Sequence, residues 1–268
     1  MATLVQRLKS ASADGRLLAA ASSPLRERYY RKALGVAYPA AGDTPSITIS
    51  GSFSSREGAE IKSAFAQACD NVSKLPASIR AIDGMSGQKY RSFINTLVER
   101  RPGASYLEVG SWAGSTLAAA LFGNDVTTLC IDNWSQFGGP RDAFFSNIAL
   151  ATSETAKVRV LEQDFRRVDF GSLGKFNIYL FDGPHAERDH YDGIRLAQAA
   201  LTDRYVLIVD DWNWRTVRNG TLKALLSCGC RVECSIEIRT TLDNSTPGVF
   251  AGQSDWHNGY FLAVIGKK

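Results

Sequence analysis

Residues 106–116 read YLEVGSWAGST and decide the fold. A short apolar run, Ser105 to Val109, leads into Gly110, and a second glycine, Gly114, precedes a segment of helical character that begins near Ser115. In such a turn, backbone N–H groups and the start of a helix approach a ligand, and glycines permit this because they lack a Cβ atom. The stretch therefore predicts a strand, a ligand-binding turn and a helix.

The spacing of the glycines favours one kind of ligand. Glu108, Gly110 and Gly114 form the pattern E-x-G-x-x-x-G, whereas a dinucleotide site prefers G-x-G-x-x-G, whose helix start cradles a pyrophosphate. An acidic residue before the turn opposes a pyrophosphate but suits a cofactor that carries an ammonium and a sulfonium group. A nicotinamide-dependent oxidoreductase is therefore the weaker alternative.

Beyond this stretch, short apolar runs alternate with helical segments. The expected strands are Ser105–Val109, Thr127–Ile131, Lys157–Leu161, Asn177–Phe181, Tyr205–Val209, Arg231–Ile238 and Tyr260–Ile265. The expected helices are Ser115–Phe122, Asp142–Thr152, Phe165–Gly171, Tyr191–Ala200 and Arg215–Ser227. Strands that alternate with helices predict an α/β fold with both sheet faces covered. We expect a Rossmann-like, seven-stranded, mainly parallel sheet whose last two strands form an antiparallel edge.

The N-terminal part is less regular. We expect residues 1–86 to form a helical extension and lid, and residues 87–268 to form the ligand-binding domain. Prolines and glycines between Val36 and Arg56 predict an irregular linker or lid. Apolar periodicity predicts helices at Glu57–Lys74 and Tyr90–Glu99.

The composition disfavours several classes of protein. The 31 Lys and Arg residues are scattered along a chain of net charge +4, so we expect no nucleic-acid partner. No apolar run approaches the roughly 20 residues that span a bilayer, so we expect no membrane partner. The five cysteines lack the spacing of a zinc site and predict free thiols in a reducing, cytoplasmic location.

Two further acids follow the next two strands in order. Asp132, with Asn133 and Trp134, ends the second strand, where an acid can accept hydrogen bonds from an adenosine ribose. Asp164 and Phe165 follow the third strand, where they can meet the adenine amino group and ring. Either acid alone is compatible with a solvated loop, but all three signals, each just past a strand, favour a nucleoside-containing ligand.

Glu108, Gly110 and Gly114, followed by Asp132 and Asp164, resemble the successive motifs of class I S-adenosylmethionine-dependent methyltransferases, over roughly residues 85–265. By this resemblance the glutamate and glycines border the methionine portion of the cofactor, Asp132 holds the ribose and Asp164 lies by the adenine. The cofactor-binding residues it implies are Glu108, Gly110, Ser111, Gly114, Ser115, Asp132, Asn133, Trp134, Asp164, Phe165 and Asp182. For Trp134, packing in the core or at the rim is the alternative.

Three aspartates follow the fourth and fifth strands. Asp182 lies in the segment FDGPH, residues 181–185, and Asp210 and Asp211 end the next strand. Ligands bind beyond the carboxyl ends of such strands, and converging carboxylates repel one another unless a cation lies between them. Asp182, Asp210 and Asp211 therefore predict a site for Mg²⁺ or a similar divalent cation. The alternative is that these aspartates cap helices and turns.

The same pattern resembles metal-assisted small-molecule O-methyltransferases of the catechol, macrolide-sugar and cephalosporin-hydroxylase-like types. Asp210-Asp211 stands where they carry Asp-Asn or an acidic pair. The resemblance implies that a metal lowers the pKa of a substrate hydroxyl, which then attacks the sulfonium methyl in line. His185 is the candidate proton acceptor, with His190 as the weaker alternative, and His185 and Asp182 are the candidate catalytic residues. His190 and His257 are expected at the surface.

We therefore expect a methyltransferase for a hydroxyl of a glycosylated natural product, a saccharide or a phenol, acting as a monomer or a homodimer. Asp-Gly-Pro-His at residues 182–185 differs from the Pro-Pro-aromatic motif typical of nitrogen methylation. Trp212, Trp214, Arg215 and Arg218 are expected either to line a polar acceptor pocket or to begin an amphipathic helix with its arginines in solvent. A non-catalytic Rossmann-like binding protein is the remaining alternative, which the intact acids disfavour.

Overall fold

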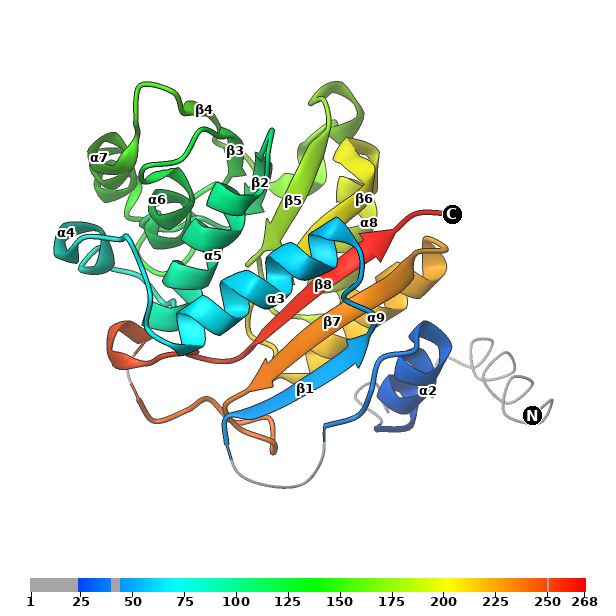
Figure 1. The fold of residues 1–268 in the computed structure, drawn as a ribbon. Helices are drawn as coiled ribbons and strands as arrows, with labels where there is room; N and C mark the ends of the chain where they lie inside the picture. The colour runs from blue at the N-terminus through cyan, green and yellow to red at the C-terminus, as the bar shows by residue number, and fades with distance from the viewer. Residues whose placement is uncertain (1–23, 40–43, 250) are drawn as a thin grey trace.

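Eight strands form one sheet in the computed structural model, which describes residues 24–39, 44–249 and 251–268 (Figure 1). The strands are β1 (Ser46–Gly51), β2 (Ser105–Val109), β3 (Thr127–Ile131), β4 (Lys157–Leu161), β5 (Phe176–Phe181), β6 (Leu201–Val209), β7 (Arg231–Arg239) and β8 (Tyr260–Gly266). The α-helices are α2 (Pro24–Leu34), α3 (Arg56–Cys69), α4 (Ala77–Arg80), α5 (Gln88–Arg100), α6 (Ser115–Leu121), α7 (Arg141–Ala151), α8 (Glu187–Ala197) and α9 (Arg215–Ser227). In these ranges no helix is long and apolar enough to cross a membrane. The first 23 residues of the predicted extension lie outside the described residues.

The strands lie in the order β1-β7-β8-β6-β5-β2-β3-β4. Strands β2 to β6 pair in parallel, and β8 lies antiparallel between β6 and β7. Every strand predicted from the sequence is present, and the predicted antiparallel edge is confirmed. Without β1, this order and direction make up the sheet of the Rossmann-like methyltransferases.

One strand, β1, was not predicted. It pairs antiparallel with β7, so the sheet has eight strands instead of the seven expected, and part of the expected linker is an edge strand. Its isoleucines, Ile47 and Ile49, are 44% and 60% exposed, while Ser50 is buried. Residues 46–50 read SITIS, so polar and apolar residues alternate as in a half-buried strand, but it is the isoleucine side that is exposed. The sequence-based boundary at residue 86 stays a prediction.

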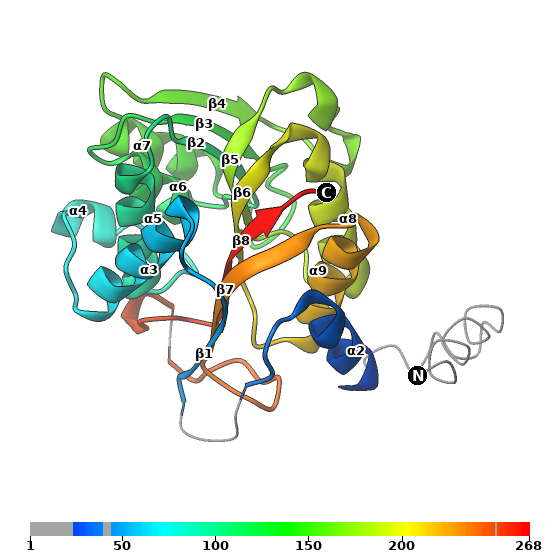
Figure 2. The same cartoon turned by 45° about the vertical axis from the view of Figure 1, so that its right-hand side comes forward.

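Helices cover both faces of the sheet, as Figure 2 shows with the sheet nearly edge-on. Helices α3 to α7 lie on one face and α2, α8 and α9 on the other. Residues of β5 alternate between the two cores: Ile178 and Leu180 belong to the first, and Tyr179 and Phe181 to the second. Burial on both faces explains why the central strands are continuous apolar runs.

Three predicted helices differ from their expected bounds by more than two residues. Helix α3 ends at Cys69, before the expected end at Lys74. The segment expected as a helix at Phe165–Gly171 forms only short 3₁₀ turns, at Phe165–Arg167 and Phe170–Ser172. Helix α8 begins at Glu187, before the expected start at Tyr191. Asp189 accepts a hydrogen bond from the amide of Ala186 at 3.0 Å, and acids in a first turn suit the helix dipole.

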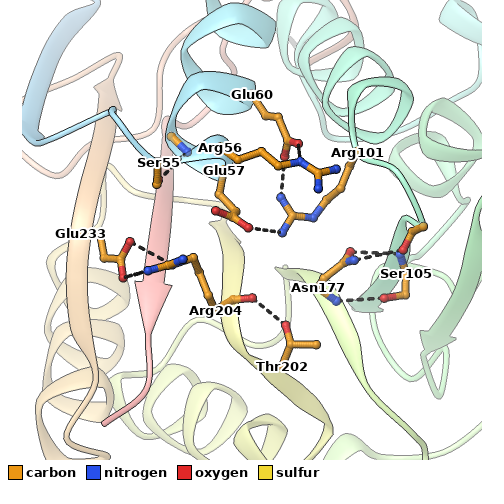
Figure 3. Close-up of polar contacts among 12 residues, drawn as sticks. Ser55, Arg56, Glu57, Glu60, Arg101, Ser105, Asn177, Thr202, Arg204 and Glu233 are labelled. Atoms are coloured by element: carbon orange, nitrogen blue, oxygen red, sulfur yellow. Dashed lines mark hydrogen bonds and ion pairs between the residues drawn. The ribbon is translucent and has the colours of Figure 1, made fainter.

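The topology defines where a ligand binds. The chain runs from β2 outward to β3 and β4, then returns to β5 on the other side of β2. Open α/β sheets bind ligands beyond the carboxyl ends of their strands at such a switch point. The amino ends of β2 and β5 are instead tied together, since Ser105 and Asn177 exchange two hydrogen bonds of 3.0 Å (Figure 3).

Candidate active site

A cavity of about 690 Å³ opens at the carboxyl ends of the parallel strands, beside the β2–β5 switch point. The loops that follow β2 to β6 form most of its wall, and the loop before β8 adds another side. The predicted site residues on the wall are Gly110, Asp132, Asn133, Asp164, Phe165, Asp182, His185, Asp210 and Asp211. Of the described residues before position 87, Met85 reaches the wall, so the cavity forms almost wholly from the part of the chain expected to bind the cofactor.

The two glycines of the turn are required by protein packing. Gly110 has φ +87°, and a Cβ atom there would lie 1.9 Å from the carbonyl oxygen of Asp182. Gly114 has φ +82°, and its Cβ would lie 2.9 Å from Cδ2 of Phe144 on α7. The sequence interpretation assigned both glycines to close approach of a ligand. The structure gives both glycines a packing role as well: Gly110 lets the end of β2 approach the end of β5, and Gly114 lets α6 approach α7. Gly110 also lies on the cavity wall, so the interpretation based on the ligand stays a prediction.

Glu108 lies beneath the turn, fully buried, and not on the cavity wall. Its carboxylate accepts hydrogen bonds from the hydroxyls of Tyr106 at 2.5 Å and Thr116 at 3.1 Å. Burial raises the pKa of Glu108 to about 7, although these hydrogen bonds oppose the rise. Glu108 therefore links β2 to the first turn of α6 through its bond with Thr116. The other predicted residues off the wall are Ser111, Gly114, Ser115 and Trp134.

Asp132 lies on the wall and also holds the turn. One carboxylate oxygen accepts the amides of Ser111 and Trp112, both at 2.8 Å, and the other accepts the amide of Trp134 at 2.7 Å. A carboxylate offers about four acceptor positions, so one remains for a ligand hydroxyl. The indole of Trp134 donates to the carbonyl of Trp112, and its ring centroid lies 5.2 Å from that of Phe144. Trp134 therefore packs against the core, which was the alternative to a place beside the adenine.

Asp164 and Phe165 line the end of the cavity beyond β4. Asp164 accepts the amide of Arg166 at 2.9 Å and so caps the short turn that follows. The ring of Phe165 packs edge-on against Phe181, 5.5 Å away. Arg166 brings a positive charge to this wall, where it pairs with Asp189 and, at 3.5 Å, with Asp192.

A cluster of carboxylates and a histidine forms the other end. Ligand atoms of Asp182, His185 and Asp211 lie within 4.8 Å of one another. Nε2 of His185 is 2.8 Å from Oδ2 of Asp211, whose Oδ1 accepts the side-chain amide of Asn258 at 2.6 Å. Asp211 has φ +57°, a conformation that surrounding contacts must hold in place.

Asp210 lies behind this cluster. The sequence grouped it with Asp182 and Asp211, whereas in the structure His185 completes the group of facing ligand atoms. The side chain of Asp210 is buried, Oδ1 accepts the amide of Asp211 at 2.6 Å, and Oδ2 has no hydrogen-bond partner. An unpartnered buried carboxylate oxygen beside two other acids is a position that a cation would stabilise.

The protonation states follow from these contacts. Burial, and then the facing carboxylates, raise the pKa of Asp182 and of Asp210 well above the usual range. Burial acts the same way on Asp211, but the hydrogen bonds from His185 and Asn258 outweigh it and lower its pKa. The pKa of His185 is raised, because the bond to Asp211 outweighs burial. Asp211, paired with His185, is therefore the acid of this group that ionises most readily, whereas Asp182 and Asp210 resist ionisation.

Several side chains differ from their expected places. Trp214 lies on the cavity wall, but Trp212 is buried and stacks on Phe261, 4.4 Å away. Arg218 is 1% exposed and faces neither the cavity nor solvent. His190, expected at the surface, is buried between α8 and α9, where burial lowers its pKa to about 3.

The loop before β8 supplies wall residues that sequence reasoning missed. Residues 246–249, His257 and Asn258 lie on the wall. The loop has no periodic pattern, and its contribution comes from the return of the chain across the strand ends. Burial lowers the pKa of His257, which was expected at the surface.

Comparison with known proteins finds likeness in structure alone. No protein-family model matches the sequence, and no curated protein matches it. TrmN from Thermus thermophilus is 18% identical over 71% of this chain, with a TM-score of 0.47, and this chain spans 52% of its length. The O-methyltransferase from Bacillus cereus in complex with SAH is 17% identical over 77% of this chain and 90% of its own, with a TM-score of 0.45. A SAH-bound methyltransferase from Podospora anserina is 14% identical over 78% of this chain and 88% of its own, with a TM-score of 0.43.

The assignment of the fold therefore depends on the strand order and on the position of the cavity. Two features agree with this assignment. Strand β8 lies antiparallel between β6 and β7, and the cavity lies beside β2 and β5. The chain has the fold of the class I S-adenosylmethionine-dependent methyltransferases.

Proposed function

We propose that the chain is an S-adenosylmethionine-dependent O-methyltransferase that acts on a small-molecule hydroxyl with the help of a divalent metal. The observation that carries the proposal is one cavity at the switch point with two acidic ends. Asp132 and Asp164 line one end, and Asp182, His185 and Asp211 line the other. This arrangement suits a cationic cofactor beside a hydroxyl that must lose a proton.

The cofactor would lie across the ends of β2, β3 and β4. Asp132 has one free acceptor position for a ribose hydroxyl, and Asp164 lies where an adenine amino group would reach it. The sulfonium and ammonium groups are cations, and they suit a cavity wall that carries the carboxyl groups of Asp132, Asp164 and Asp182. A pyrophosphate would meet the same carboxylates unfavourably, which disfavours a nicotinamide cofactor.

The residues at the other end fit a divalent metal. Asp182, Asp210 and Asp211 would hold it, since carboxylate oxygens are the preferred ligands of Mg²⁺ and Mn²⁺. When bound, the metal supplies Lewis acidity that lowers the pKa of a substrate hydroxyl. In its neutral form His185 donates from Nε2 to Asp211, and Nδ1 is then the nitrogen that accepts the hydroxyl proton. The hydroxyl oxygen forms a bond to the methyl carbon as the carbon–sulfur bond breaks, leaving a methyl ether and S-adenosylhomocysteine.

The acceptor end favours an uncharged substrate. Trp214, Pro247 and Val249 give it aromatic and apolar surface, and no Lys or Arg of the described residues joins the wall at this end. A phenol, a saccharide or a glycosylated natural product presents hydroxyls on rings that pack against a tryptophan face. The chemistry thus selects a neutral ring-borne hydroxyl.

Cofactor binding tests the proposal first. Calorimetry with S-adenosylhomocysteine should show binding, and NAD should show none. Asp132→Asn should raise the dissociation constant about tenfold, because a hydrogen bond to a charged group contributes about 1.5 kcal/mol or more. Asp142→Asn is the matched control, since its side chain is 99% exposed on α7. Binding of NAD without S-adenosylhomocysteine would replace the proposal with an oxidoreductase.

Methyl transfer tests the reaction itself. With trideuteromethyl S-adenosylmethionine, mass spectrometry of a panel of phenols and saccharides should reveal one labelled methyl group on oxygen in the presence of Mg²⁺. Asp182→Asn should abolish the transfer while S-adenosylhomocysteine still binds. Binding of the cofactor product with no transfer to any hydroxyl in the panel would favour the non-catalytic binding protein.

A further inference from the structure

Arg218 is the most fully bonded buried charge in the described residues. It lies on α9, 1% exposed, and each of its N–H groups has a partner. A guanidinium offers five donors in a rigid planar arrangement. Since all of them are used by separate acceptors, Arg218 fixes the relative positions of the segments that supply those acceptors.

The acceptors come from three segments. Glu27 of α2 accepts two bonds, at 2.7 and 3.2 Å. The carbonyls of Trp212 and Asn213 accept bonds of 2.8 and 2.5 Å, directly after Asp211. Asn244 accepts a bond of 2.9 Å at the start of the loop that continues into the cavity wall at residues 246–249. Arg218 therefore joins an N-terminal helix to two parts of the acceptor end.

Glu27 is the anchor of this network on α2. Its side chain is fully buried and lies 2.9 Å from Arg31 as well as 2.7 Å from Arg218. Burial alone would raise the pKa of Glu27, but the two arginines lower it, so it is ionised. Arg31 in turn pairs with Glu237 on β7 at 2.8 Å. Removing one member of such a buried network leaves an uncompensated charge, so α2 is held firmly on α9 and β7.

A second contact from α2 reaches the histidine side of the cluster. Arg26 donates two bonds of 3.2 Å to Glu187, the first residue of α8 and two residues after His185. Helix α2 packs against α9 on the sheet face that α8 and α9 cover (Figure 2). None of its residues lies on the cavity wall. It therefore braces both chain segments that carry the His185–Asp211 pair without touching the cavity.

We propose that Glu27 and Arg218 are positioning residues that hold Asp211 and the loop at residues 240–249 in the arrangement needed at the acceptor end. Asp211 has a positive φ, so its orientation depends on how the two residues after it are held, and Arg218 binds both of their carbonyls. The proposal rests on the proposed function for the role of Asp211, but the coupling of α2 to the turn stands on the contacts alone. Asp132 and Asp164 do not touch this network, so the cofactor end should be independent of it.

The test compares full-length Glu27→Gln and Arg218→Lys with a matched control, Arg101→Lys. Arg101 is also a buried guanidinium, 7% exposed, and donates to Glu60 at 2.6 Å and Glu57 at 3.4 Å between α3 and α5 (Figure 3). Glu27→Gln keeps the shape of the side chain and removes its charge, so it remains informative if Arg218→Lys fails to fold. Hydrogen–deuterium exchange, calorimetry with S-adenosylhomocysteine and titration with Mn²⁺ followed by electron paramagnetic resonance are the readouts.

We expect Glu27→Gln and Arg218→Lys to speed amide exchange at residues 211–214 and 240–249. The dissociation constant for Mn²⁺ should rise about tenfold, as for other changes behind metal ligands, and that for S-adenosylhomocysteine should stay unchanged. Arg101→Lys should lower stability without either effect. Faster exchange confined to α2, or a Mn²⁺ affinity equal to that of the control, would overturn the proposal. If the unaltered protein binds neither Mn²⁺ nor S-adenosylhomocysteine, the proposed function fails. Amide exchange at residues 211–214 then decides by itself whether α2 is coupled to the turn after Asp211.

Discussion

Substituting Gly110 by alanine separates two explanations for the glycine turn. If the glycine serves the approach of a ligand, Gly110→Ala should weaken cofactor binding and leave the fold intact. In the structure, however, the added Cβ would lie 1.9 Å from the carbonyl oxygen of Asp182. That oxygen belongs to the backbone at the end of β5, so no rotamer change relieves the overlap.

The size of the effect follows from two contributions. Alanine at positive φ costs about 1–2 kcal/mol. Overpacking typically costs a further 1–3 kcal/mol, and the backbone overlap at Gly110 places it near the upper end, for a total of about 3–5 kcal/mol. Gly103 is the matched control, since it has φ +64° and its Cβ would meet nothing within 4 Å. Gly103→Ala should therefore show the backbone contribution alone.

Urea unfolding of the two variants measures the difference, and calorimetry with S-adenosylhomocysteine measures binding. We expect Gly110→Ala to lose about 2–3 kcal/mol more free energy of unfolding than Gly103→Ala. Equal losses in the two variants, accompanied by weaker binding only in Gly110→Ala, would refute the packing explanation and restore the one based on the ligand.

Three further predictions concern the charged groups. Asp211→Asn should lower the pKa of His185, because the ring loses the negative partner that raises it. Nitrogen NMR of the metal-free protein measures this pKa, and an unchanged value would contradict the 2.8 Å pairing. Glu108 has a pKa of about 7 in the folded chain against an ordinary value of 4.5, so the unfolded state ionises first and the free energy of unfolding should fall as pH rises from about 4.5 to about 7. Glu108→Gln should flatten that fall, which urea unfolding at several pH values measures. If the free energy of unfolding falls equally with pH in the variant and in the unaltered protein, Glu108 is not the buried carboxyl responsible. A chelator should abolish methyl transfer, with recovery on added Mg²⁺ or Mn²⁺ but not Na⁺; full activity in the chelator would remove the metal from the proposal.

The sheet was predictable because its strands are buried on both faces. Runs such as Ile178 to Phe181 and Tyr205 to Val209 are continuously apolar, and glycine or proline follows the ends of β2 and β5. The acids at the strand ends converge because parallel strands end at one edge. β1 was not predicted although Ile47 and Ile49 alternate with polar residues, because prolines and glycines surround it and its place in the sheet depends on pairing with β7.

Side-chain direction limited the prediction of the site. Successive residues of a strand point to opposite faces, so Glu108 shares a face with Tyr106, which donates to it, and points into the core. Asp210 and Asp211 lie just past the end of β6, where this rule no longer sets the direction of a side chain. The alternation was visible in the sequence, but the positive φ of Asp211, which turns its carboxylate toward His185, was not.

The acids of the cavity differ in how many hydrogen-bond donors already contact them. This difference distinguishes the proposed cofactor end from the proposed metal end. Asp132 accepts three backbone amides and has room for one ligand hydroxyl, so it recognises by hydrogen bonding. Asp182 and Asp210 instead have raised pKa values, and one oxygen of Asp210 has no partner. Protons and a divalent cation would compete for those oxygens, because both relieve the same repulsion. A divalent cation held by Asp182 and Asp210 would therefore bind more tightly as pH rises.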